Sequence, residues 1–274
     1  MSHKTLLDLT QNREELIAIL RAIIADPALT GGDLDKLGRT HARRDGRQIF
    51  SRDELIRAYR TFAGQDGLPA YDPAVLGRLR MKPVRTSSGV TPVTILTKPF
   101  PCPGECIFCP NDVRMPKSYL SDEPGAQRAE QNSFDPYLQT MSRLTAYYNT
   151  GHPTDKIELI ILGGTWSFYP ETYQIWFVKR AFDALHDFGV GINHSAEIEA
   201  ALRDVSQLHP DRNITTVQIA GVDLARSYNQ VVQTVYHEEM RRSRELVEHV
   251  ARVDERSPVD EYATWEELED AQRF

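Results

Sequence analysis

Cysteine is scarce in this chain, and its scarcity limits the inorganic chemistry that the protein can support. The 274 residues contain three cysteines, Cys102, Cys106 and Cys109, in the spacing C-x3-C-x2-C. An odd number of thiols on one tight loop excludes an ordinary set of disulfides. Three thiolates so close together can instead face one inorganic centre. A 4Fe–4S cluster usually takes four cysteine ligands, so a cluster held by three would leave one iron open to a small molecule.

Zinc is the main alternative for these cysteines. A structural zinc site prefers four ligands, and no fourth cysteine exists, so a histidine would have to complete the set. The downstream candidates are His152, His186 and His194, and none stands in a C-x2-C-like register. A loop whose cysteines are only structural is the third possibility.

Long apolar segments are also missing. No stretch approaches the roughly 18 consecutive apolar residues of a membrane-spanning helix, so we expect no membrane partner. Most of Met1–Asp8 is polar or charged, and we therefore expect no signal peptide. Clustered cysteines that stay reduced are typical of a reducing compartment, which predicts a cytoplasmic protein.

Acidic residues predominate overall, but not at the start of the chain. The net charge is −7, whereas residues 1–100 carry sixteen Lys and Arg against eleven Asp and Glu. A basic front half favours a nucleic-acid face, and a solvated surface without a partner is the alternative. Tyr59 and Tyr71 lie among the basic residues and could stack on bases. The candidate phosphate contacts are Arg39, Arg43, Arg44, Arg47, Arg78, Arg80, Lys82 and Arg85.

Periodicity and capping residues predict two domains, a helical one over residues 1–80 and an α/β one over 81–274. The helices predicted in the first domain are 6–24, 33–39, 51–62 and 72–79. In the second, Val90–Leu96 and Lys156–Leu162 are predicted as strands, the latter covered on both faces. Phe134–Tyr148 and Pro170–Phe188 are predicted as helices. The last predicted elements are a weak strand at Ile214–Ile219, a charged helix at Asp223–Val253 and a short helix at Trp265–Ala271.

Both strands end at residues that suit a ligand site. The cysteine loop follows the first strand, and active sites of parallel β/α barrels occupy loops of this kind. Gly163-Gly164-Thr165 follows the second strand, where two glycines would let a ligand approach the backbone closely. A tight turn without a ligand is the simpler interpretation of the double glycine.

The cysteine spacing, with Phe108 just before the third cysteine, resembles the signature of the radical S-adenosylmethionine (SAM) enzymes. The resemblance implies that Cys102, Cys106 and Cys109 hold a 4Fe–4S cluster whose open iron binds SAM. It further implies that Gly163, Gly164 and Thr165 line SAM. The superfamily usually has an acidic residue where this chain has Thr165, which can form hydrogen bonds but brings no charge.

Additional motifs between Lys82 and Phe188 narrow the resemblance. They are Arg85-Thr86, Ser88-Gly89, Glu123-Pro124, Arg128-Ala129, Asp135–Thr140, Gly151-His152 and Asp155-Lys156. With the cysteines and Gly163–Thr165 they are similar to the radical SAM domain of the Elongator catalytic subunit. This resemblance implies a tRNA-modifying enzyme that forms 5-carboxymethyluridine at the wobble position from acetyl-CoA. It implies that Lys156 binds acetyl-CoA and that the basic helical front end binds tRNA.

The family continues through further β/α units and a carboxy-terminal acetyltransferase domain, whereas this sequence stops at Phe274. We therefore expect an α/β fold in which the helical domain precedes an incomplete radical SAM β/α barrel. Such a chain would be a fragment that binds the cluster, SAM and tRNA without completing the reaction. Its partners would include a missing carboxy-terminal half or Elongator-like subunits. The alternative is a non-catalytic tRNA-binding module with a structural Fe–S or zinc site.

Overall fold

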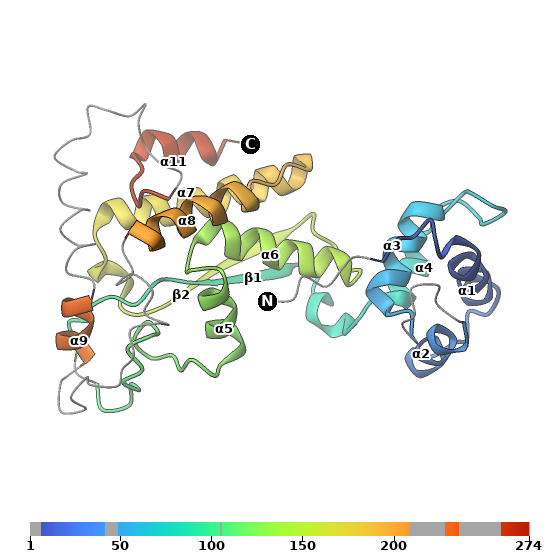
Figure 1. The fold of residues 1–274 in the computed structure, drawn as a ribbon, viewed down its shortest axis with the longest axis horizontal. Coiled ribbons are helices and arrows are strands. Elements are labelled where there is room, and N and C mark those ends of the chain that lie inside the picture. Colours follow the sequence, from blue (N-terminus) through green and yellow to red (C-terminus); the bar gives the residue numbers. More distant parts are fainter. Residues whose placement is uncertain (1–6, 42–48, 105, 209–227, 236–258, 274) are drawn as a thin grey trace. The chain divides into compact units, whose positions relative to one another are not determined.

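The computed structural model describes residues 7–41, 49–104, 106–208, 228–235 and 259–273, and its fold is α/β (Figure 1). The chain divides into two compact units. The first comprises Met1–Pro92 and Leu144–Glu158, and the second comprises Val93–Arg143 and Leu159–Phe274. The predicted domains, 1–80 and 81–274, stay a prediction.

Four helices and a 3-10 turn form most of the first unit. They are α1 (Arg13–Ala25), α2 (Gly31–Thr40), α3 (Arg52–Phe62), α4 (Pro73–Leu79) and η1 (Pro83–Thr86). Apolar residues at helical spacing meet in one core that includes Leu16, Leu20, Leu55, Ile56 and Leu79. The predicted starts of two helices are confirmed. Glu54 accepts the Ser51 N–H at 2.8 Å, and Asp72 accepts the Ala74 N–H at 2.8 Å.

The first helix begins later than the sequence predicts, at Arg13 instead of Leu6. The Asp8 carboxylate accepts the N–H groups of Thr10, at 2.8 Å, and Gln11, at 3.1 Å. An aspartate that bonds to the backbone two and three residues ahead forms a turn, which competes with the helix. Apolar spacing alone does not reveal this competition.

Two parallel strands, β1 (Thr91–Leu96) and β2 (Ile157–Leu162), form the sheet of the described residues. The Thr91 N–H donates to the Lys156 carbonyl and the Thr97 N–H to the Leu162 carbonyl, each at 2.9 Å. The two strands therefore keep the same register at both ends. The prediction that β2 is covered on both faces is wrong, because Glu158 is exposed and the other five residues are partly exposed. Two strands do not close a barrel, and the predicted partial barrel is not confirmed.

Helices supply most of the second unit. They are α5 (Pro124–Gln131), α6 (Pro136–Asn149, which ends in the first unit), α7 (Glu171–Val190), α8 (Ser195–Leu208), α9 (Tyr228–Val235) and α11 (Trp265–Ala271), with a 3-10 turn η2 (Trp166–Phe168). Tyr137 and Met141 of α6 pack with Ala184 of α7 and Ile198 of α8. The short carboxy-terminal helix α11 is confirmed at its predicted bounds and packs on α7 (Figure 1).

Two helices of this unit, α5 and α8, were not predicted from the sequence. The buried face of α5 consists of small residues, Ala126 and Ala129, which give a weak hydrophobic period. The predicted strand Ile214–Ile219 lies outside the described residues. So does all of the predicted helix Asp223–Val253 except the segment that forms α9.

At the end of β1, the backbone of Leu96 is paired by a side chain. Gln139 of α6 accepts the Leu96 N–H at 2.9 Å, and its amide donates to the Leu96 carbonyl at 2.8 Å. Alternate residues of a strand direct their backbone groups to opposite edges, so Leu96 faces away from β2. The amide thereby satisfies a donor and an acceptor that the sheet leaves unpaired.

Candidate functional site at the cysteine loop

The cysteine loop follows β1 directly. Thr97 still pairs with β2, and the three prolines between residues 99 and 103 then end the strand, because proline cannot donate to a ladder. All three cysteines are free thiols. Cys102 and Cys109 are partly buried, and Cys106 is exposed. Phe108, between them, is 92% exposed, so the tip of the loop faces solvent.

Two hydroxyl groups from other segments contact the cysteine sulfurs. Thr165 Oγ1 lies 3.4 Å from Cys102 Sγ, and Ser118 Oγ lies 3.2 Å from Cys109 Sγ. Burial acts to raise the pKa of Cys102, but hydrogen bonds from Thr165 and the Gly104 backbone, with the Lys117 charge, outweigh it and leave the pKa below that of an ordinary thiol. The lowered pKa makes the thiolate, which binds metals, more accessible here than in an ordinary cysteine.

The double glycine brings the end of β2 against the end of β1. A Cβ atom on Gly163 would lie 1.9 Å from Thr97 Oγ1, so a larger residue fits only if the Thr97 side chain moves, and the φ of +156° at Gly163 also disfavours a side chain. Thr97 is fully buried, and its hydroxyl lies 2.8 Å from that of Tyr169. A Cβ on Gly164 would make only ordinary contacts, at 3.7 Å from Lys117. The space at Gly163 is thus filled by Thr97, whereas Gly164 could carry a Cβ in ordinary contact with Lys117 and Tyr169.

A lysine that was not predicted from the sequence lies in this site. Lys117 is 8% exposed, donates to Asn111 Oδ1 at 2.7 Å and lies 4.7 Å from the centre of the Tyr228 ring. Its positive charge acts on Cys102. No spacing or motif marks Lys117, because its burial depends on α9, more than one hundred residues further along the chain.

The chemistry of the donors suits an iron–sulfur cluster. Three thiols on one loop, none of them in a disulfide and one with a lowered pKa, are the soft ligands that such clusters take. In the part of the chain that the structure describes, no group of three or more His, Cys, Asp or Glu side chains is placed to hold a metal ion, and this includes the three cysteines. The loop therefore supplies three thiol donors, but they do not form a completed metal site.

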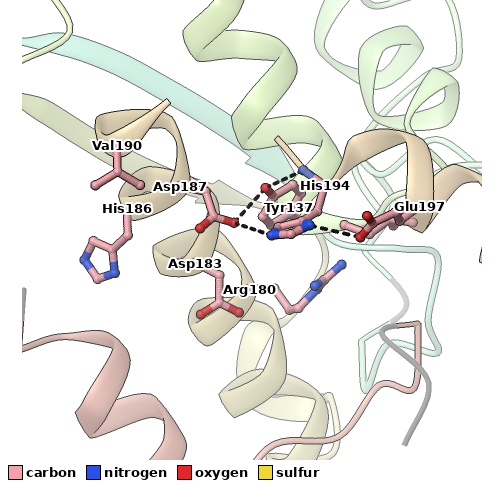
Figure 2. A pocket seen from close by; sticks show the side chains of 9 residues that line it. Tyr137, Arg180, Asp183, His186, Asp187, Val190, His194 and Glu197 are labelled. Carbon is pink, nitrogen blue, oxygen red and sulfur yellow. Dashed lines mark hydrogen bonds and ion pairs between the residues drawn. The ribbon is translucent and has the colours of Figure 1, made fainter. Parts of the chain in front are cut away.

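The histidines considered for zinc have other contacts. His152 is buried, with Nδ1 2.8 Å from Thr86 Oγ1. His186 and His194 line a hollow of about 580 Å³ beside α7 and the start of α8 (Figure 2). His194 Nδ1 lies 2.9 Å from Glu197 Oε2. These contacts give the zinc alternative no support.

The hollow in Figure 2 is built around a tyrosine that joins three helical segments. Tyr137 of α6 donates to Asp187 Oδ2 at 2.8 Å and accepts the His194 N–H at 3.1 Å. Burial raises the pKa of Tyr137 to about 12, so the hydroxyl keeps its proton and its donor role at neutral pH. The network fixes the turn between α7 and α8, and its residues are not those predicted for the cluster or SAM.

The predicted phosphate contacts fall into three groups. Arg39, Lys82 and Arg85 are exposed. Arg78 donates to the Asp26 carbonyl at 3.0 Å and Arg80 to the Gly151 carbonyl at 2.9 Å, so both hold the protein's own backbone. The remaining candidates, Arg43, Arg44 and Arg47, lie outside the described residues.

Three further residues that were predicted to contact a ligand lie among the described residues. Tyr59 is 1% exposed, so the expectation that it stacks on a base is wrong, whereas Tyr71 is 48% exposed and stacks on Tyr59 with ring centres 5.6 Å apart. Lys156 is exposed and immediately precedes β2, while Gly163 follows that strand. Lys156 therefore does not stand at the strand end that carries the glycines.

The fold and the site define an α/β protein with a cysteine loop and a glycine pair at the carboxyl ends of two parallel strands. No family profile matches the chain. Over 115 residues it is 50% identical to the tRNA uridine(34) acetyltransferase of Methanocaldococcus infernus, covering 40% of this chain and 22% of that protein. Over 107 residues it is 48% identical to the protein of the same name from Dehalococcoides mccartyi, covering 39% and 23%.

Elongator complex protein 3 of Homo sapiens is 36% identical over 128 residues, which cover 43% of this chain and 23% of the human protein. These matches confirm the resemblance to the Elongator catalytic subunit family, to which this segment of the chain is homologous. The matched segments span less than a quarter of each of these relatives. Among the described helices, none is long and apolar enough to cross a membrane.

Proposed function

We propose that this chain provides the cluster-binding and SAM-binding part of an enzyme that modifies the wobble uridine of tRNA. The observation that carries the proposal is the 3.4 Å contact between Thr165 Oγ1 and Cys102 Sγ. It brings the predicted SAM motif against the predicted cluster motif, at the carboxyl ends of adjacent parallel strands. The names of the relatives, tRNA uridine(34) acetyltransferase and Elongator complex protein 3, support the choice of tRNA as substrate.

The chain's own residues have distinct roles in this proposal. Cys102, Cys106 and Cys109 would hold a 4Fe–4S cluster, which when bound supplies an electron for the reductive cleavage of SAM. Thr165 steadies the Cys102 sulfur through its hydroxyl. Lys117 contributes a positive charge beside Cys102. We assign SAM to the surface formed by Gly163, Gly164 and Thr165.

The finer part of the proposal concerns acetyl-CoA. We propose that acetyl-CoA is the carbon donor, that Lys156 binds its phosphates and that the product is 5-carboxymethyluridine. Lys156 is exposed, as a lysine that meets a polyphosphate must be. These assignments rest on the family resemblance and on the accessibility of that side chain.

The test is anaerobic reconstitution with iron and sulfide, followed by electron paramagnetic resonance of the reduced protein with and without SAM. We expect a 4Fe–4S signal that changes when SAM is added. Replacing all three cysteines by serine should abolish the signal. Thr165→Val keeps the three cysteines, so the cluster should remain. It removes the hydroxyl from the surface assigned to SAM, so the response to SAM should weaken.

Two results would overturn the proposal. A cluster signal that is the same with and without SAM would indicate a structural Fe–S site. Zinc without sulfide, in protein purified anaerobically, would indicate a zinc-dependent RNA-binding protein. In either case a Cys109→Ser variant that still bound tRNA normally would identify a non-catalytic binding module.

A further inference from the structure

The backbone at Cys102 is isolated from the sheet. Pro101 and Pro103 flank it, so neither neighbour has an N–H group. A segment of this composition cannot extend the ladder between β1 and β2, and the Cys102 backbone must find its partners elsewhere. Cys102 is partly buried, and whatever binds its backbone fixes the point from which its side chain extends.

A single side chain, that of Asn229, provides both partners. The Cys102 N–H donates to Asn229 Oδ1 at 2.9 Å, and Asn229 Nδ2 donates to the Cys102 carbonyl at 2.8 Å. An asparagine amide carries one acceptor and two donors, so it can replace a neighbouring strand for one residue. The contact joins positions 127 residues apart in the sequence.

The helix that carries Asn229 is itself fixed beside the loop. Tyr228 is 3% exposed, and its hydroxyl donates to the Met115 carbonyl at 2.8 Å. Its ring contacts the Lys117 ammonium group. Val231 and Val232 are also buried, three and four residues after Tyr228, which is the spacing of one helical face. The position of α9 relative to the cysteine loop is therefore set by several contacts.

We infer that α9 is a brace for the cysteine loop and that Asn229 is a positioning residue for Cys102. The inference rests on the proposed function in so far as it gives Cys102 the role of a cluster ligand. Asn229 does not contact the sulfur. It holds the backbone on both sides of the Cys102 side chain, so that the cysteine is oriented before a cluster binds.

Hydrogen exchange of the metal-free full chain tests the brace directly. Residues 99–104 contain three prolines, so their backbone N–H groups are those of Phe100, Cys102 and Gly104, and the Cys102 amide is followed at single-residue resolution. In Asn229→Leu we expect that amide to exchange about fivefold faster or more, the change expected when one hydrogen bond is removed. Asn229→Asp keeps the acceptor for the N–H but sets a second oxygen against the Cys102 carbonyl, so it should lose part of the protection.

Gln233→Leu is the matched control, because it removes an amide from an exposed position of the same helix. It should leave exchange at residues 99–104 unchanged. Equal exchange in Asn229→Leu and wild type would overturn the inference. Acceleration in both leucine variants would mean that α9 as a whole has been disturbed, and would overturn the specific role of Asn229.

Iron and sulfide content after anaerobic reconstitution links the brace to the proposed cluster. We expect Asn229→Leu to retain less than half of the wild-type content and Gln233→Leu to retain all of it. If the wild-type protein takes up no cluster, the proposed function fails, yet the exchange measurement still decides whether Asn229 orders Cys102. If the cluster forms normally in Asn229→Leu although exchange is faster, the positioning role is wrong and the proposed function stands.

Discussion

At the scale of single residues, one carboxylate organises the segment that follows the cysteines. Asp112 Oδ1 accepts from the Arg114 backbone N–H and Nε, and Asp112 Oδ2 accepts from Arg114 Nη2 and the Ser121 N–H, all at 3.0–3.2 Å. Burial acts to raise the pKa of Asp112, but these hydrogen bonds outweigh it and lower the pKa to about 2. Asp112 therefore stabilises the fold in its charged form.

Asp112→Asn should lower the free energy of unfolding at pH 7 by about 1–2 kcal/mol, because it removes hydrogen bonds to a charged acceptor. A carboxyl whose pKa is depressed by folding stabilises above its unfolded pKa, near 4, and this contribution disappears as the pH falls toward 2. Urea unfolding between pH 7 and pH 2.5 should therefore show the wild type converging on the variant at low pH. Asp122→Asn, at an exposed position, is the control. A gap between wild type and Asp112→Asn that stays constant with pH would contradict the assignment.

At the scale of elements, the two strands converge at their carboxyl ends because Gly163 has no side chain. Thr97, just after β1, fills the space that a Cβ on Gly163 would need. Its hydroxyl lies 2.8 Å from the Tyr169 hydroxyl, which also donates to the Lys98 carbonyl at 2.8 Å. This arrangement aligns the cysteine loop with Thr165, so the packing of the strand ends determines the geometry of the site.

Gly163→Ala should destabilise the protein by about 1–3 kcal/mol, as overpacking in a filled core does. Gly164→Ala is the matched control and should cost less, since its Cβ meets only ordinary contacts. In thermal unfolding, Gly163→Ala combined with Thr97→Ala should lose less stability than the two single variants together, because Thr97→Ala removes the clashing hydroxyl. Strict additivity would show that Gly163 is needed for another reason.

At the scale of the whole molecule, basic residues of the first compact unit divide between structure and surface. Arg78 and Arg80 bind backbone carbonyls inside that unit, whereas Arg39, Lys82 and Arg85 are exposed. Lysine and arginine on a surface bind phosphates and displace counterions. If this unit binds tRNA, as the resemblance implies, the exposed group should carry the salt-sensitive part of the binding.

Replacing Arg39, Lys82 and Arg85 together by alanine should weaken tRNA binding. It should also reduce the slope of log K against log salt by about 1 for each phosphate that the variant no longer neutralises. Filter binding at a series of salt concentrations measures both quantities. Lys36→Ala is the control, because that lysine is exposed in the same unit and already paired with Asp33. An unchanged affinity and slope in the triple variant would exclude this surface as the tRNA site.

Local features of the fold and site could be predicted from the sequence. Ser51 with Glu54 and Asp72 mark helix starts, and the apolar run after Lys156 marks a strand. The helices α5 and α8 could not be predicted, because α5 buries only small side chains and α8 lies beyond the last recognisable motif. The sequence predicted too much burial for β2, because an apolar run shows that its residues prefer to be buried but not which elements pack against them.

The sequence by itself determined the chemistry of this protein: three thiols on one loop, a glycine pair after a strand and the motifs shared with the Elongator catalytic subunit family. Only the tertiary structure decided which groups surround those thiols. Thr165, Lys117 and Asn229 reach Cys102 from other segments of the chain, and Tyr59 is buried. The physical reason is the distance along the chain over which each interaction acts. Caps and spacings depend on neighbours in the chain, whereas burial and long-range hydrogen bonds exist only after the elements have packed.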